Sequence, residues 1–92
     1  MDYEWSEVKE KLNIIKHGVD FKEAKSVFGD EYALVLYDEE HSENEERFLL
    51  LGMSEKERVL LVVHCYKEED TIRIISARKA TARERKQYEE RL

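Results

Sequence analysis

The spacing of apolar residues predicts a first helix near the start of the chain. Asp2–Trp5 is a short lead-in that could form an edge strand. Ser6 is a candidate N-cap, and the helix it opens runs to about Lys16. The apolar residues of this region share one face at helical spacing: Trp5, Val8, Leu12 and Ile15. A helix of this length is unstable alone, so we expect it to pack on other elements.

A second, shorter helix follows after Gly18, which is well placed as the residue past the end of the first helix. Asp20 and Glu23 have the spacing of a capping box, which marks a helix start. Gly29 and Asp30 end this segment. The residues expected on its buried side are Phe21, Ala24, Val27 and Phe28.

The middle of the chain has the pattern of a β-sheet. The four strand-like runs are Tyr32–Tyr37, Arg47–Met53, Arg58–Tyr66 and Thr71–Arg78. Short connections join the last three, which predicts an antiparallel meander. Arg58–Tyr66 is apolar at both alternating positions, so it should be covered on both faces and central. The first connection, residues 38–46, is long and acidic, and we expect it to be exposed.

The chain closes with a polar helix over about Ala82–Glu90, opened by a second capping box from Thr81 and Glu84. The predicted fold class is therefore α+β. It has two N-terminal helices, a four-stranded, mainly antiparallel sheet and a C-terminal helix, and residues 1–92 form a single domain.

Composition agrees with a folded protein of a reducing compartment. Hydrophobic and charged residues each make up 41% of the 92 residues, and the apolar ones are clustered in runs. The one cysteine, Cys65, excludes an internal disulfide and is expected to be a small core residue. No apolar run reaches the ~18 residues of a membrane span, and the acidic N-terminus is unlike a signal peptide. We therefore expect a cytoplasmic protein without a membrane partner.

Charge is unevenly distributed along the chain, whose net charge is −6. Residues 1–70 hold 9 Lys/Arg and 19 Asp/Glu, whereas residues 71–92 hold 7 and 3. The excess of acidic residues argues against a broad surface that binds double-stranded nucleic acid. It is compatible with a local anion site near the C-terminal end.

Basic residues cluster around the connection between the last predicted strand and the last predicted helix. Arg78 and Lys79 come just before the helix N-terminus, where free N–H groups and the helix dipole favour an anion. Arg73 lies earlier on the strand, and two interpretations stay open for it: a phosphate contact, or a salt bridge to the acidic connection or Glu46. The later cations could be only a solvated helix face: Arg83, Arg85, Lys86 and Arg91.

Other chemistries find little support. No histidine has the i, i+3 or i+4 histidine partner of a metal-ligand pair, and we expect neither a metal nor a cofactor. No nucleophile elbow and no glycine-rich phosphate loop occurs. His64 is either a half-buried strand residue or a substrate contact.

Three stretches together resemble the BrnT toxins over nearly the whole chain. They are Asn13–Phe21 (NIIKHGVDF) with Glu23 and Ala24; His41-Ser42 and Glu46–Phe48 ahead of Gly52; and Ile72–Thr81 (IRIISARKAT) with Glu84 and Tyr88. The resemblance implies an α+β fold similar to RelE-type ribonucleases. It also implies a bacterial type II toxin that cleaves RNA and arrests translation, with a BrnA-like antitoxin carrying a ribbon-helix-helix part. The complex would bind operator DNA through the antitoxin and repress its own operon.

RNA cleavage without a metal needs fixed cations, because it builds negative charge on a phosphate attacked by the neighbouring 2′-OH. The candidates for catalysis are Arg73, Arg78, Lys79 and Glu84. The candidates for RNA binding are Lys16, His17, Arg47, His64 and Tyr88. Capping for Glu84, core packing for Tyr88 and an internal ion pair for Arg47 stay open as structural roles. An alternative function is a catalytically weak module that holds its antitoxin and co-represses DNA.

Overall fold

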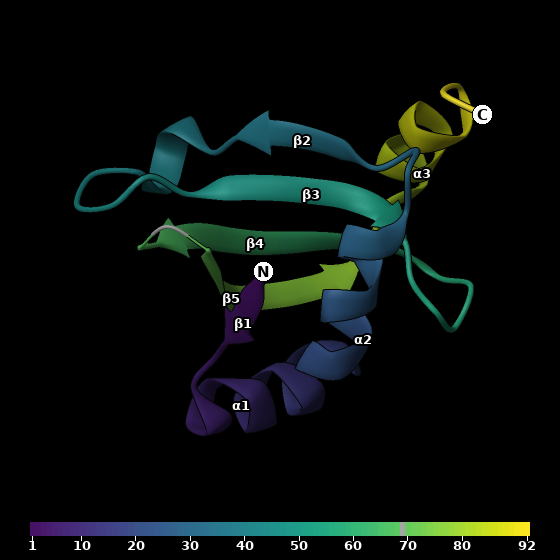
Figure 1. Cartoon of the computed structure of the whole chain (residues 1–92). Helices are drawn as coiled ribbons and strands as arrows, with labels where there is room; N and C mark the ends of the chain where they lie inside the picture. The colour runs from purple at the N-terminus through teal and green to yellow at the C-terminus, as the bar shows by residue number, and fades with distance from the viewer. Residues whose placement is uncertain (69) are drawn as a thin grey trace.

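A computed structural model describes residues 1–68 and 70–92 and shows a five-stranded sheet with helices on both faces (Figure 1). The strands are β1 (Asp2–Glu4), β2 (Leu34–Tyr37), β3 (Phe48–Met53), β4 (Val59–Lys67) and β5 (Thr71–Lys79). The helices are α1 (Glu7–His17), α2 (Phe21–Ser26) and α3 (Ala82–Glu89), with 3-10 turns at Val27–Gly29 and Glu39–His41. The connection predicted at Lys67–Asp70 includes Glu69, which lies outside the described residues.

The sheet has the order β1-β5-β4-β3-β2. Strands β2, β3, β4 and β5 pair antiparallel, each with the next along the chain, and β4 is the central strand of the sheet. Both observations confirm the predicted meander. The prediction of four strands was wrong, because β1 adds a fifth strand, parallel to β5, with Asp2 opposite Thr71. The α+β class holds, with a mixed sheet. The lead-in at Asp2–Trp5 was interpreted as a possible edge strand, and β1 forms there at the sheet edge, but its partner β5 lies far away in the sequence.

One face of the sheet carries the larger core. Phe21, Ala24 and Val27 of α2 and its following turn are fully buried, as predicted. They belong to one cluster with sheet residues, which include Leu50, Leu60, Val62, Ile74 and Ala77. Burial of this apolar surface is the main stabilising contribution.

The predicted capping box of α2 is only half present. Asp20 accepts a hydrogen bond from the Glu23 N–H at 2.7 Å, as an N-cap should. The Glu23 carboxylate does not return this bond. It is fully buried, pairs with the Arg58 guanidinium and accepts a bond from Ser54 Oγ at 2.7 Å. The Arg58 hydrogen bond holds the pKa of Glu23 below its usual range, so the buried carboxyl is paired and charged.

Helix α1 packs differently from its predicted apolar stripe. Val8, Leu12 and Ile15 are exposed by 69%, 61% and 82% of their surfaces, and only Asn13 of the helix is buried. The Asn13 amide donates to the Ala77 and Val19 carbonyls at 2.8 and 2.9 Å and accepts from the Ala77 N–H at 3.1 Å. Helix α1 therefore lies beside the edge of β5, below the sheet in Figure 1, where β1 has ended. There it completes the strand's hydrogen bonds.

The other face of the sheet is covered at one end only. Tyr88 of α3 is buried against Leu51 and Leu61, which confirms a core role for this residue. Its hydroxyl donates to Asp30 Oδ2 at 2.5 Å. The rest of this face has no helix over it among the described elements. Within the described residues, no helix has the length and apolar character needed to cross a membrane.

Candidate functional site

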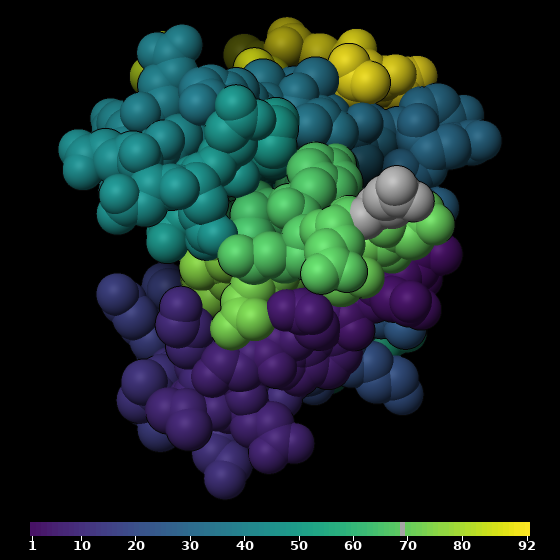
Figure 2. All heavy atoms as spheres, turned by 60° about the vertical axis from the view of Figure 1, so that its left-hand side comes forward, coloured from purple at the N-terminus to yellow at the C-terminus, as the bar shows by residue number. Residues whose placement is uncertain are grey.

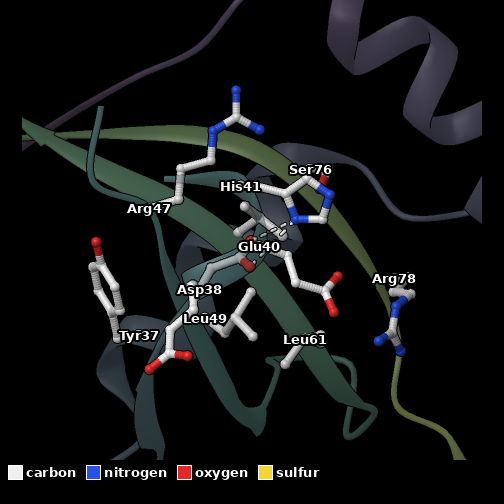
Figure 3. Close-up of a pocket in the computed structure, with 11 residues that line it drawn as sticks. Tyr37, Asp38, Glu40, His41, Arg47, Leu49, Leu61, Ser76 and Arg78 are labelled. Atoms are coloured by element: carbon white, nitrogen blue, oxygen red, sulfur yellow. Dashed lines mark hydrogen bonds and ion pairs between the residues drawn. The ribbon is translucent and has the colours of Figure 1, made fainter. Parts of the chain in front are cut away.

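A cavity of about 670 Å³ opens on the face that α3 leaves uncovered. Its floor is apolar, from Leu49, Leu61 and Val63 of β3 and β4. Ser76 and Arg78 of β5 stand opposite Val63 and Leu61 in the β-ladder, and residues two apart on a strand share a face. Figure 3 shows Arg78 at one side of this floor. The remaining wall comes from Arg47 and the segment Tyr37–His41.

Arg78 is held at the corner between β5 and α3. Its Nη1 and Nη2 atoms donate to Glu84 Oε1 and Oε2 at 2.8 and 3.0 Å. Glu84 Oε1 also accepts the Thr81 N–H at 2.9 Å, which completes the predicted capping box. The Arg78 hydrogen bond lowers the pKa of Glu84 to about 2, so the carboxyl is ionised at neutral pH. One carboxylate therefore caps the helix and orients the guanidinium.

Arg73 and Lys79 lie outside the cavity lining. Arg73 Nη1 donates to Glu4 Oε2 at 2.7 Å, and these residues are register partners on β5 and β1. The salt bridge predicted for Arg73 is therefore present, but the expected partner in the acidic connection was wrong. Lys79 is exposed beside Arg78. The basic corner thus presents one arginine to the cavity, whereas Lys79 and Arg73 are not part of its lining.

Lys16 and His17 line a smaller neighbouring hollow of about 260 Å³. Ser76 contributes to both hollows and lies between them. Arg47 lines the large cavity from the other side, and its Nε atom is buried with no hydrogen-bond partner in the described part of the chain. The structure therefore places these three predicted residues around the same region of the sheet.

His64 and Tyr88 are core residues. His64 is fully buried on the face covered by α2, with its ring 4.9 Å from Phe28 and 6.1 Å from Phe48. Burial lowers the pKa of His64, which favours the neutral ring. Burial and the Asp30 bond raise the pKa of Tyr88 to about 12. Either side chain would have to leave the core to contact RNA, so neither His64 nor Tyr88 belongs to the proposed RNA-binding site.

The segment after β2 supplies site residues to which we gave no role in the site from the sequence, although His41 belongs to the stretches that resemble the BrnT toxins. Asp38 and His41 line the cavity, and His41 Nδ1 lies 3.1 Å from Asp38 Oδ2. In Figure 2, the teal residues of this part of the chain stand out above the yellow-green residues of β5. The signal was the i, i+3 spacing of Asp38 and His41 inside an acidic run. Only the folded connection shows that this run reaches back over the sheet.

Metal-ligating side chains do not gather at this site. In residues 1–68 and 70–92 no group of three or more His, Cys, Asp or Glu side chains is arranged to hold a metal ion. Cys65 is buried, and burial raises the pKa of its thiol, so it stays protonated at neutral pH. The lining of the cavity carries guanidinium, imidazole, hydroxyl and carboxylate groups.

Comparisons with known proteins identify the family and a similar fold. A comparison with curated proteins finds no match. The fold is similar to the crystal structure of the Brucella abortus ribonuclease toxin BrnT, with a TM-score of 0.69 and 24% sequence identity. That match covers 88% of this chain and 97% of the Brucella chain. The sequence model of the ribonuclease toxin BrnT of type II toxin–antitoxin systems matches residues 5–84. This chain therefore belongs to the BrnT family of ribonuclease toxins.

Proposed function

We propose that this chain is an endoribonuclease that cleaves RNA without a metal ion, at the cavity on the uncovered face of the sheet. The observation that carries the proposal is the orientation of Arg78. Two hydrogen bonds to Glu84 hold its guanidinium at the rim of an open cavity. A fixed cation of this kind stabilises charge that develops on a phosphate without reorganising during the reaction.

The residues around the cavity suggest how RNA is held. Arg78 contacts the phosphate under attack, and Arg47 contacts the same or the next phosphate from the opposite wall. Lys16 and His17 hold the flanking chain in the adjoining hollow beyond Ser76. Arg73 and Lys79 add positive potential nearby. Glu84 is a positioning residue, because its two oxygen atoms already accept bonds from Arg78 and from Thr81.

The biological role follows from the family. We propose that the whole chain acts as one cytoplasmic toxin domain, related in fold to RelE-type ribonucleases, and that RNA cleavage arrests translation. Its partner is a BrnA-like antitoxin with a ribbon-helix-helix part, and operator DNA is contacted only through that antitoxin. The acidic net charge of −6 supports this division, since a duplex-binding surface needs many cations.

Induced expression of the chain tests the proposal. The wild type should stop growth and degrade RNA, and the purified protein should cleave RNA in the presence of EDTA. Arg78→Ala should lower the cleavage rate by about 10²-fold or more, as expected for loss of one charge-stabilising group. The matched control is Arg85→Ala, which removes an exposed arginine from α3 outside the cavity and should leave cleavage unchanged.

A second function has an observation in its favour. Arg73 and Arg78 already pair with carboxylates, and acidic residues line the cavity, which lowers the affinity for phosphate. This would suit a weakly catalytic module that binds its antitoxin and co-represses the operon. A folded wild type that binds antitoxin but cleaves no RNA, with or without metal ions, would favour this alternative.

A further inference from the structure

The Asp38–His41 pair is the feature of the cavity that the phosphate contacts leave unexplained. His41 Nδ1 lies 3.1 and 3.3 Å from the two carboxylate oxygens of Asp38. A carboxylate only accepts hydrogen bonds, so the Nδ1 atom carries the proton and donates it. The lone pair of the neutral ring is then on Nε2, which makes no hydrogen bond within the described part of the chain. Asp38 thus orients the ring, and the basic Nε2 atom is available to accept a proton.

The backbone around this pair is fixed by hydrogen bonds at the base of the segment. The Asp38 N–H donates to the Arg47 carbonyl at 2.9 Å, which closes the segment on itself. Ser42 Oγ donates to the Asp38 carbonyl at 2.5 Å and accepts from the Arg47 N–H at 3.0 Å. Ser42, the residue after His41, therefore links the backbone at the two ends of this segment, Asp38 and Arg47. The imidazole is held over the sheet although 61% of its side chain is exposed.

The cavity brings this imidazole to the same space as the proposed phosphate contacts. His41, Ser76, Arg47 and Arg78 all line it (Figure 3). The charged groups that line the hollows around His41 are Asp38, Glu39, Glu40, Glu43 and Glu45 from its own segment, Arg47 just before β3, and Arg78 from β5. A base placed across a cavity from fixed cations can take a proton while the cations bind the phosphate.

We propose that His41 is the general base of this ribonuclease site and that Asp38 is the residue that positions it. The proposal rests on the ribonuclease function proposed above and adds the proton-transfer group to it. His41 Nε2 takes the proton of the 2′-OH while the 2′-oxygen forms a bond to phosphorus. The bond from phosphorus to the 5′-oxygen breaks, and that oxygen takes a proton from solvent water. The products are a 2′,3′-cyclic phosphate and a 5′-hydroxyl end, and the imidazolium returns its proton to solvent.

Variants of the purified toxin test this assignment on an RNA substrate with Arg78 intact. His41→Ala should lower the cleavage rate by about 10²–10⁴-fold, and added imidazole should restore part of it. Asn44→Ala, in the same exposed segment but outside the lining of the cavity, should cleave like the wild type. Circular dichroism of each variant should match the wild type, because His41 makes no core contact.

Cleavage rates of single and double variants test the positioning role of Asp38. Asp38→Asn removes the carboxylate that orients the ring and should slow cleavage in a protein that keeps His41. If Asp38 acts only through His41, the double variant Asp38→Asn/His41→Ala should be no slower than His41→Ala alone. Effects that add fully in the double variant would overturn the positioning role.

A substrate with sulfur in place of the bridging 5′-oxygen separates base from acid. A thiolate leaves without a proton, so a defect in the general acid disappears on this substrate, whereas a defect in the base persists. His41→Ala should therefore be as impaired on the sulfur substrate as on RNA. Recovery of the wild-type rate on it would overturn the assignment of His41 as base.

The remaining outcomes distinguish this inference from the proposed function. A wild type that cleaves RNA while His41→Ala cleaves at the same rate overturns the role of His41 and leaves the ribonuclease standing. A wild type that cleaves no RNA overturns the ribonuclease and the assignment with it.

Discussion

At the scale of single residues, Glu84 joins the stability of α3 to the geometry of the site. Its two oxygens accept from Arg78, and one of them also accepts from the backbone of Thr81. Loss of this carboxylate would release both the helix end and the guanidinium. The side chains of Arg78 and Glu84 are 37% and 25% exposed, so solvent screening reduces the strength of the pair.

The low pKa of Glu84 makes this contribution pH-dependent. Its folded pKa of about 2 lies below the ordinary value of 4.5, so its stabilising contribution is present above about pH 4.5 and is lost as the pH falls toward 2. Glu84→Gln should lower the free energy of unfolding at pH 7 by about 1–2 kcal/mol, after allowance for screening. Near pH 2 the variant and the wild type should be almost equally stable.

Urea unfolding of both proteins from pH 7 to pH 2 checks this expectation. Glu89→Gln removes an exposed carboxylate from the same helix and serves as the control. Acid sensitivity from the buried Glu23, whose pKa is also lowered, remains in all three proteins. A constant difference between Glu84→Gln and the wild type over the whole range would contradict the low pKa of Glu84.

The residues predicted for the site divide by how far their partners lie in the sequence. The Thr81–Glu84 capping box and the basic corner at Arg78 are local patterns, and both could be predicted. The Arg73–Glu4 pair joins opposite ends of the chain, and no local pattern predicts such a contact. His41 was missed as a site residue because its place depends on how residues 38–47 fold back over β3.

At the scale of elements, α1 shows that an apolar stripe at helical spacing does not always mark the packed face. The Asn13 amide bonds the edge of β5 through both polar groups of Ala77, and this geometry turns the stripe to solvent. A rule based on hydrophobic period cannot identify such a helix, since the decisive residue is polar. The hairpins from β2 to β5 were predictable, because short connections and alternation are local.

Paired variants of α1 check this arrangement. Asn13→Ala leaves the N–H and carbonyl of Ala77 and the carbonyl of Val19 without this partner. It should lower the free energy of unfolding by about 3 kcal/mol or more, at ~1–3 kcal/mol for each of the three groups left unsatisfied. Ile15→Ala, at an 82% exposed position of the same helix, should change it by less than about 0.5 kcal/mol. Chemical denaturation measures both, and the reverse order would show that the stripe packs on the protein.

At the scale of the whole molecule, the site proposed for the anionic RNA lies in a cavity of an acidic protein. Glu39 and Glu40 line the same cavity as Arg47 and Arg78, so they repel a phosphate that the arginines attract. We expect this repulsion to weaken RNA binding, while the arginines proposed to stabilise the reacting phosphate keep their positions. It also favours cationic partners at this face over anionic ones.

A charge-neutralising variant tests that balance. Glu39→Gln/Glu40→Gln should bind RNA several-fold more tightly at low salt, and the gain should shrink at high salt as charges are screened. Fluorescence anisotropy with a labelled RNA measures the affinity. The control is Glu55→Gln/Glu57→Gln in the β3–β4 connection, which carries the same charge change at the other end of β3. An equal gain in the control would mean that net charge alone, and not the cavity, sets the affinity.

The pairing of β1 with β5 has a consequence for the order in which this toxin can form during its synthesis. The ribosome makes β1 well before β5, yet β5 lies between β1 and β4 in the sheet. A nascent chain that lacks β5 has an unpaired first strand, no anchor for Asn13 and no Arg78. Folding dominated by such distant contacts waits until the distant segments are available. The ribosome that makes the protein thus completes β5 before the cavity exists.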